Sequence, residues 1–246
     1  MPPPHGCAWR GEGRVRMDWR EFAEQMALLA RRLLAQESAQ ETLDEIVQAA
    51  VELIEGCEAS GILALRKGRA VTLATTADMV VESDRLQGEL GEGPCFDAAR
   101  RANEDRLFRI ADLTQPQPDW SRYAPAAREL GVGSMMGFLL YTHDDDFGAL
   151  NLYSSRPGAF TPDSETAGWL LASHAAVALA GARTVDQLEH ALETRHAIGE
   201  AMGILRERHR LSEDDAFAVL RRISQHHNVK LRDVAQNIRS GARKQS

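Results

Sequence analysis

The chain has 246 residues, of which 43% are hydrophobic and 26% charged, and its formal net charge is −7. These values are close to globular averages and exclude collagen-like, mucin-like and wholly disordered chains. The acidic total also argues against a protein whose whole surface is covered by nucleic acid. Three cysteines are too few for a disulfide framework, which favours a reducing, cytoplasmic location. The longest apolar run, residues 169–182, is shorter than the roughly 20 residues of a membrane span, so no membrane contact is expected.

The charge is divided unevenly along the chain. Residues 195–246 hold 11 Lys and Arg against 6 Asp and Glu, whereas residues 1–194 hold 18 against 30. The net charges of these segments are therefore +5 and −12. An acidic body with a basic end is typical of a regulator with an anionic partner at that end. The alternative is a basic helix face that only contacts solvent.

Two amphipathic helices are predicted near the N-terminus, over residues 19–35 and 42–55. Thr42 and Glu45 have the spacing of a capping box at the start of the second helix. The preceding residues, 1–17, contain Pro, Gly and Arg without periodicity. They are predicted to be a disordered tail, unless the protein starts at Met17.

The hydrophobic period then changes to that of strands. Five short strands are predicted, over residues 60–65, 70–74, 107–110, 134–141 and 149–153. Helices are predicted between them, over residues 76–86, 95–101 and 120–130. The sequence therefore predicts an α+β domain in which an antiparallel sheet is flanked by helices.

A very long helix is predicted from Pro162 to about His209, because only glycines interrupt the pattern, at about 1 kcal/mol each. Unbroken, it would extend roughly 70 Å. One small domain cannot cover such a helix, so we expect it to pair with a copy of itself as a coiled coil in a homodimer. The residues predicted to form the dimerisation seam are Leu188, Leu192, Ile198, Met202 and Leu205.

Two short helices are predicted to follow the long one and to complete an all-α, three-helix end. Ser212 is the expected N-cap of the first of them, and Asn228 its expected stop. The residues predicted to face inward are Ala216, Phe217, Leu220 and Ile223 in the first, and Leu231, Val234, Ala235 and Ile238 in the second.

Basic residues of this end are the strongest candidates for function, because the arginine fork suits phosphates and base edges. If the three helices form a bundle, these residues could converge on one face. The candidate nucleic-acid contacts are Arg195, Arg206, Arg208, Arg221, Arg222, Lys230 and Arg232.

Other motifs give weaker signals. Cys95 follows Gly93 and Pro94, where helix N-terminal amides could lower its thiol pKa and make it a redox sensor; the alternative is a small buried hydrophobe. The run 144–146 of three aspartates lacks the spaced oxygens of a calcium loop, and the histidines lack ligand spacing, so no metal is expected. No P-loop, metalloprotease or nucleophile-elbow motif occurs, and we expect no enzyme.

Residues 40–184 resemble a GAF domain, with two helices, a hairpin, a glycine-rich crossover, a helix, a strand pair and a closing helix. The stretch 90–95, Leu-Gly-Glu-Gly-Pro-Cys, looks like the form seen when this domain precedes an RNA-binding module. The resemblance implies a sensor for a small molecule or a protein partner, whose ligand it does not identify. Glu92 and Cys95 are the candidate sensor-loop residues.

Residues 186–243 resemble the ANTAR domain, the three-helix RNA-binding module of transcription antiterminators. The residues that carry the match are Arg195, 198–199, 201–205, 211–212, 216–217, 220–221, Asn228, Leu231, 233–235 and Ile238. A basic residue often stands where this chain has Met202, which shifts the expected phosphate contacts onto the arginines that follow.

Together, these resemblances imply a non-enzymatic, signal-responsive regulator of the GAF–ANTAR transcription antitermination family. We expect a disordered tail at 1–17, a sensor domain at 18–184 and an RNA-binding domain at 185–246. Such proteins dimerise through the long helix and bind paired hairpin loops in a nascent transcript. Two alternatives remain: a DNA-binding regulator, since residues 212–238 could form a helix-turn-helix, and a redox sensor that uses Cys95.

Overall fold

A five-stranded sheet with the order β2-β1-β5-β4-β3 forms the centre of the N-terminal part, and every neighbouring pair is antiparallel. Its strands are β1 (Ala59–Arg66), β2 (Arg69–Thr75), β3 (Leu107–Ile110), β4 (Ser134–Tyr141) and β5 (Asp146–Ser154). The five predicted strands are confirmed, although β5 begins three residues before its predicted start.

The computed structural model describes residues 17–66, 69–100, 107–141 and 146–243. The chain divides into two compact units, Met1–Ala182 and Arg183–Ser246. Apart from residue 17, the tail predicted over residues 1–17 lies outside the described residues, and so do Asp144 and Asp145 of the aspartate run. Within the described ranges, no helix is both long enough and apolar enough to cross a membrane.

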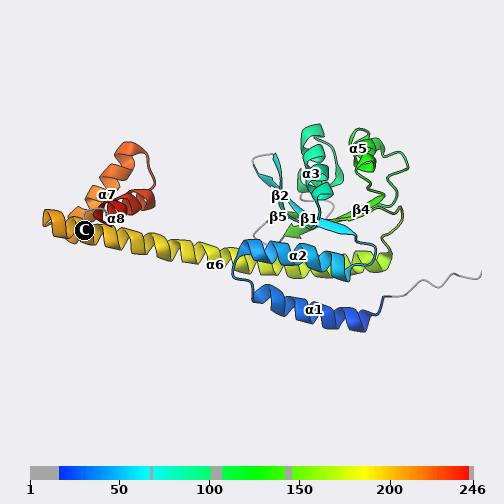
Figure 1. Ribbon diagram of the computed structural model, residues 1–246, viewed down its shortest axis with the longest axis horizontal. Coiled ribbons are helices and arrows are strands. Elements are labelled where there is room, and N and C mark those ends of the chain that lie inside the picture. The colour runs from blue at the N-terminus through cyan, green and yellow to red at the C-terminus, as the bar shows by residue number, and fades with distance from the viewer. Residues whose placement is uncertain (1–16, 67–68, 101–106, 142–145, 244–246) are drawn as a thin grey trace, which may run out of the picture. The chain divides into compact units, whose positions relative to one another are not determined.

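Two helices cover one face of the sheet (Figure 1): α2 (Ala39–Leu53) and the first part of α6 (Pro162–His209). A third helix, α1 (Trp19–Leu34), packs on them from the side away from the sheet. Their apolar stripes place Leu29, Ile46 and Leu171 in one buried cluster with Phe138 and Leu150 of the sheet. Burying a side chain of this size contributes about 1.5–3 kcal/mol to folding. The α+β class and the 162–209 helix predicted from the sequence are confirmed.

The start of α2 corrects the predicted cap. Ser38, not Thr42, is the N-cap, and its hydroxyl accepts the Glu41 backbone N–H at 3.2 Å. Thr42 lies inside the helix, where its hydroxyl donates to the Ser38 carbonyl at 3.0 Å. Ser38 and Glu41 have the same spacing as Thr42 and Glu45, so the sequence holds two consecutive capping boxes. A helix that starts at the Ser38 box is about one turn longer than one that starts at the Thr42 box.

The other face of the sheet carries α3 (Asp78–Leu90), α4 (Pro94–Arg100), the 3₁₀ turn η1 (Pro118–Trp120) and α5 (Tyr123–Glu129). The predicted 76–86 helix begins two residues later and continues to Leu90, where Gly91 ends it with a φ of +63°. The predicted 120–130 helix is shorter, because the chain leaves η1 through a turn and α5 starts at Tyr123.

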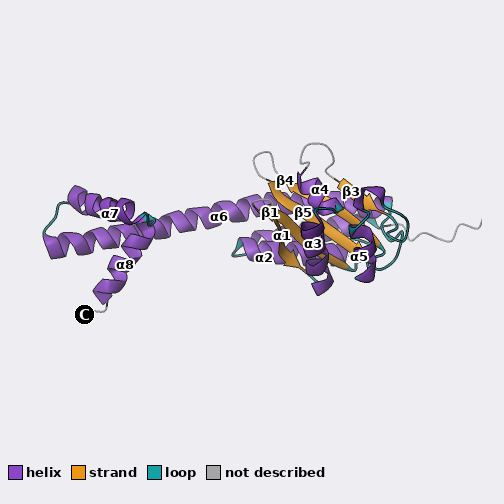
Figure 2. Ribbon diagram, turned by 90° about the horizontal axis from the view of Figure 1, so that it is seen from above, coloured by secondary structure: helices purple, strands orange, loops and turns teal. Residues whose placement is uncertain are grey.

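The C-terminal unit contains the last part of α6 with α7 (Glu213–His227) and α8 (Leu231–Arg243), as Figure 2 shows. Its core is formed by Ala197, Ala201, Leu205, Ala216, Leu220, Val234 and Ala235. The predicted cap at Ser212 and stop at Asn228 are confirmed, and Arg210 and Asn228 have φ near +50°. The inward orientation predicted for Phe217 is wrong: Ala216 and Leu220 occupy the core side of α7, and Phe217 is 41% exposed.

Candidate nucleic-acid interface and sensor core

The seven basic residues predicted to contact RNA all lie in the C-terminal unit. Arg232 is half-buried, and its Nε lies 3.3 Å from the Asp233 carboxylate. The other six are exposed: Arg195, Arg206, Arg208, Arg221, Arg222 and Lys230. Six guanidinium or ammonium groups are therefore accessible to an anionic partner.

The structure does not bring these residues into one group. Arg195 and Arg232 line one hollow of about 440 Å³ beside α6, and Arg221 and Arg222 lie in the second half of α7, with Lys230 following its end. Arg206 and Arg208 are at the end of α6, next to the start of α7. The first turn of α7 carries three acidic residues, 213–215, which weaken the positive potential there. The second half of α7 is thus the better phosphate-binding segment.

The residues of the predicted dimerisation seam differ in burial. Leu205 is buried in the three-helix core, and Ile198 and Met202 are half-buried against it. Leu188 and Leu192 are 61% and 57% exposed, and Val185, one turn earlier on the same stripe of α6, is 51% exposed. Large apolar side chains this exposed along one stripe are typical of a helix that pairs with a partner.

A buried polar cluster fills the space between α3, α5 and the sheet. The Tyr123 and Ser83 hydroxyls are 2.8 Å apart, and Ser83 donates to the Tyr153 hydroxyl at 3.4 Å. Tyr153 in turn donates to Asp84 Oδ1 at 3.3 Å, and the Thr72 hydroxyl donates to Asp84 Oδ2 at 2.7 Å. Burial raises the pKa of Asp84 to about 7, against the lowering effect of these two hydroxyls. We call Ser83, Asp84, Gln87, Cys95, Tyr123 and Tyr153 the sensor core.

Two amides on this side of the sheet are incompletely bonded. The Gln87 Oε1 accepts the backbone N–H groups of Cys95 and Phe96 at 3.0 and 3.3 Å, but its Nε2 is buried without a partner in the described part of the chain. The amide nitrogen and oxygen of Asn151 are also buried without a partner among the described residues. Asn151 alternates along β5 with Leu150 and Leu152, which face the opposite core. Buried unsatisfied amides cost about 1–3 kcal/mol each and mark places where a polar ligand would bond.

Cys95 has the environment of a structural thiol. It is fully buried, and burial, followed by the charge of Asp84, raises its thiol pKa well above the usual value. The redox alternative requires an accessible thiolate, so the structure disfavours it.

We expect Cys95 to resist iodoacetamide in the folded protein at pH 8 and to react once urea unfolds the chain. Buried Cys57, whose pKa burial raises to about 12, is the internal control and should behave in the same way. Mass spectrometry of tryptic peptides measures both sites. Rapid labelling of Cys95 but not Cys57 in the native protein would restore the redox alternative.

Glu92, the other predicted sensor-loop residue, fastens its loop to α5. Its carboxylate accepts the Arg122 Nε at 2.7 Å and the Arg122 and Tyr123 backbone N–H groups at 2.9 and 3.3 Å. Arg122 Nη2 also donates to the Leu90 carbonyl at 2.6 Å. These hydrogen bonds, first that from the Arg122 side chain, lower the pKa of Glu92. Glu92 therefore caps α5 and holds Tyr123 in the sensor core.

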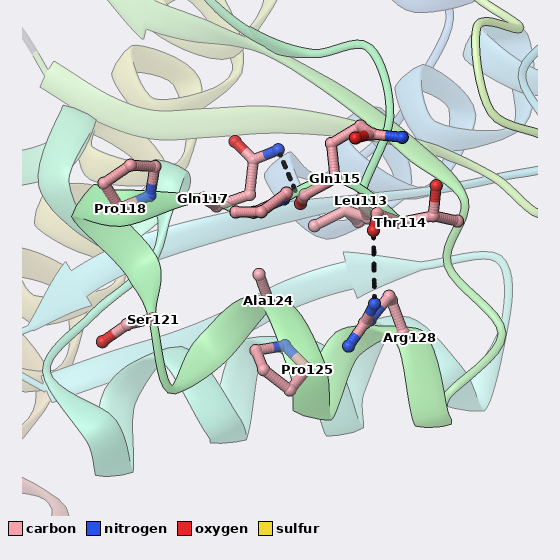
Figure 3. Close-up of a pocket in the computed structure, with 10 residues that line it drawn as sticks. Leu113, Thr114, Gln115, Gln117, Pro118, Ser121, Ala124, Pro125 and Arg128 are labelled. Carbon is pink, nitrogen blue, oxygen red and sulfur yellow. Dashed lines mark hydrogen bonds between the residues drawn. The ribbon is translucent and has the colours of Figure 1, made fainter.

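A surface hollow of about 330 Å³ lies beside α5, between this helix and residues 113–118 (Figure 3). Leu113 and Ala124 provide apolar walls, and Arg128 donates to the Thr114 carbonyl at 3.4 Å across it. Gln117 donates to the Gln115 carbonyl at 3.3 Å. The lining of the hollow is mainly apolar and includes three prolines, and none of its residues belongs to the sensor core.

The sequence prediction missed most of the sensor core. One signal was present: Val80, Ser83, Asp84 and Gln87 follow the i, i+3, i+4, i+7 spacing of a buried helix face, although three of them are polar. Tyr123 and Tyr153 reach the same place from α5 and β5, which only the folded structure brings together.

Two family models match the chain in sequence order. A model described as GAF domain matches residues 36–180, and one described as ANTAR domain matches residues 186–238. GAF domains are sensory and ANTAR domains belong to RNA-binding antitermination regulators, and neither is catalytic. A comparison with curated proteins finds no match.

Solved structures share the fold at low sequence identity. The chromophore-binding domain of the bacteriophytochrome RpBphP3 from R. palustris is 12% identical, with a TM-score of 0.52 over 68% of this chain. This chain covers only 64% of that domain. The GAF domain of a phosphoenolpyruvate-protein phosphotransferase from Coxiella burnetii is 18% identical, with a TM-score of 0.54 over 70% of this chain and 99% of its own. The chain belongs to the GAF domain family and carries an ANTAR domain after its GAF domain.

Proposed function

We propose that this protein is a signal-responsive transcription antiterminator that binds hairpin loops in nascent RNA through its C-terminal unit. The observation that carries the proposal is the ANTAR match over residues 186–238 together with the exposed Arg221, Arg222 and Lys230 within it. Hairpin loops expose unpaired bases that side chains can reach, and basic residues neutralise the phosphates beside them.

The protein acts as a homodimer in this proposal. The exposed stripe of Val185, Leu188 and Leu192 supports pairing of α6 with a second copy. A dimer presents two RNA-binding units, which matches a transcript with two hairpins. Because Ile198, Met202 and Leu205 are engaged in the three-helix core, we now place the seam N-terminal to them.

The GAF domain supplies the regulation. Its sensor core contains a carboxyl group with a raised pKa and the buried Gln87 Nε2, which has no partner among the described residues. The Asn151 amide, on the same side of the sheet, is also buried without a partner among these residues, and both features support binding of a small polar molecule. We propose that binding of this molecule, or of a protein partner, changes how the α6 helices pair and thereby the spacing of the two RNA-binding units. Cross-linking that gives the same dimer with and without the signal would contradict this mechanism.

Replacing Arg221 and Arg222 together by glutamine is expected to weaken binding of hairpin RNA about tenfold or more near 0.1 M salt and to flatten the salt dependence. Each lost phosphate contact lowers the slope of log K against log salt by roughly 0.7 to 0.9. Titration of a labelled RNA hairpin at several salt concentrations measures both changes. The matched control is Arg20→Gln with Arg31→Gln, two exposed arginines of α1, which should leave the slope unaltered.

Competition between hairpin RNA and duplex DNA tests the DNA-binding alternative. The antiterminator is expected to prefer the hairpin at every salt concentration, because its contacts are to loop bases as well as phosphates. A preference for duplex DNA would overturn the proposed function, and an unchanged slope in the Arg221 and Arg222 variant would move the RNA-binding surface elsewhere on the unit.

A further inference from the structure

A hollow of about 320 Å³ opens between the end of α7 and the side of α8. Its floor is apolar: Val234 is 5% exposed, and Ile223 and Ile238 are half-buried. Its rim is formed by His227, Val229 and Asn237, all exposed. A hollow with an apolar floor and a few polar groups at its edge is the usual form of a site for a flat organic ligand.

The rim of this hollow is held in place by the turn that ends α7. Asn228 has a φ of +50°, and the Val229 N–H donates to the Ser224 carbonyl at 3.0 Å. The Ser224 hydroxyl donates to the Val229 carbonyl at 2.7 Å. These two bonds fix Val229 at the mouth, although its side chain is 37% exposed. The hollow is thus preformed, which reduces the entropy lost when a ligand enters.

The surroundings of the hollow favour an anionic ligand. Lys230 follows Val229 directly, and Arg222 lies on α7 one turn before His226. The rings of His226 and His227 meet edge to face, with centroids 4.9 Å apart. The carboxylate of Asp233, one turn before Asn237 on α8, is paired with Arg232 at 3.3 Å. A ligand with a flat apolar part would match the floor, and an anionic backbone attached to it would match the basic residues beside the hollow.

We propose that this hollow is a base-binding pocket, which takes one unpaired base of an RNA loop. The base lies on the apolar floor against the His227 ring, and the Asn237 amide, which can both donate and accept, hydrogen-bonds to its edge. Lys230 and Arg222 contact the adjoining phosphates. The proposal rests on the proposed RNA-binding function and adds to it Asn237 as the residue that distinguishes one base from another. Arg221 and Arg222, in contrast, contribute affinity for any RNA sequence.

The test uses the full-length protein and hairpin RNAs with a constant stem and a randomised loop. Selection gives the preferred loop, and an abasic site is then introduced at each of its positions. For the natural protein, one abasic position should weaken binding about 5- to 100-fold, the usual range for a lost stacked base. In Asn237→Ala, the selected loops should show a weaker base preference at that position, and an abasic site there should lower the affinity less than it does for the natural protein. The slope of log K against log salt should stay unchanged.

The control is Gln236→Ala, an exposed neighbour on α8 that does not line the hollow, which should select the same loop as the natural protein. If Asn237→Ala and Gln236→Ala select alike, the base pocket is overturned while RNA binding stands. A change of molar mass in light scattering on Asn237→Ala would instead make the hollow an interface between copies and overturn the proposal. If the natural protein binds no hairpin at all, the proposed function fails first, and the pocket with it.

Discussion

Replacing Leu188 and Leu192 together by glutamate is expected to dissociate the proposed dimer and to lower the affinity for a two-hairpin RNA by a factor of about 10² to 10⁴. Each change places a carboxylate where the exposed leucine would face its counterpart across the seam. The second hairpin then no longer binds at the high effective concentration that a dimer provides. The affinity for a single hairpin should change less than about twofold, because no residue of the RNA-binding surface is altered.

Light scattering measures the dimer, and titrations with one-hairpin and two-hairpin RNAs measure the affinities. The control is Gln187→Glu with His190→Glu, which adds the same two carboxylates to exposed positions away from the seam stripe of α6. This variant should remain a dimer. Dissociation of both variants would point to charge repulsion in general, and persistence of the dimer in both would place the interface elsewhere.

The seam shows where sequence periodicity stops being informative. Leu188, Leu192, Ile198, Met202 and Leu205 form one plausible apolar series, and nothing in their spacing separates contacts within the chain from contacts between chains. The difference arises because α7 and α8 pack against only the last part of α6. On the same helix, Leu205 is therefore buried in the three-helix core while Leu188 and Leu192 stay exposed, and only the tertiary structure separates the two sets.

The sequence predicted a helix end well where a single residue with a strong backbone preference fixes it. Pro162 starts α6 and Asn228 ends α7 at the expected positions, since proline lacks the N–H that a helix start leaves free and asparagine tolerates positive φ. The α2 cap was missed because two equal capping boxes follow one another, at 38–41 and 42–45. The sensor core was missed because its hydrogen bonds join residues 40 and 70 positions apart, such as Ser83 with Tyr123 and Tyr153.

Asp84→Asn is expected to stabilise the GAF domain at pH 8 by about 2 to 4 kcal/mol in free energy of unfolding and to abolish most of the pH dependence between pH 4 and 7. Asp84 has a pKa of about 7 in the folded protein, raised by burial from its usual value of 3.8. Its ionised form is therefore disfavoured in the sensor core. Asparagine keeps the shape of the neutral acid, and the Thr72 hydroxyl can turn to accept from the new amide.

The direction in which stability changes with pH follows from the protons that the folded and unfolded states bind. Between about pH 4 and 7, the folded state holds a proton on Asp84 that the unfolded chain has released, so stability falls as the pH rises through this range. Above about pH 7 both states are ionised, and this contribution becomes constant. Cys95, Tyr123 and Tyr153, which surround Asp84, have pKa values raised well above their usual ranges and stay neutral throughout.

Urea unfolding of the full chain, followed by tryptophan fluorescence, isolates this effect, because all four tryptophans precede residue 170 and thus report on the N-terminal unit. The control is Asp112→Asn, the same change at an exposed carboxylate whose pKa is lowered by hydrogen bonds from Thr114. Its effect should have the opposite sign, with stability lost at neutral pH and recovered toward acid. If Asp84→Asn instead destabilises the domain at pH 8, the fold stabilises the Asp84 carboxylate instead of disfavouring it, and a cation or a donor group must contact it there.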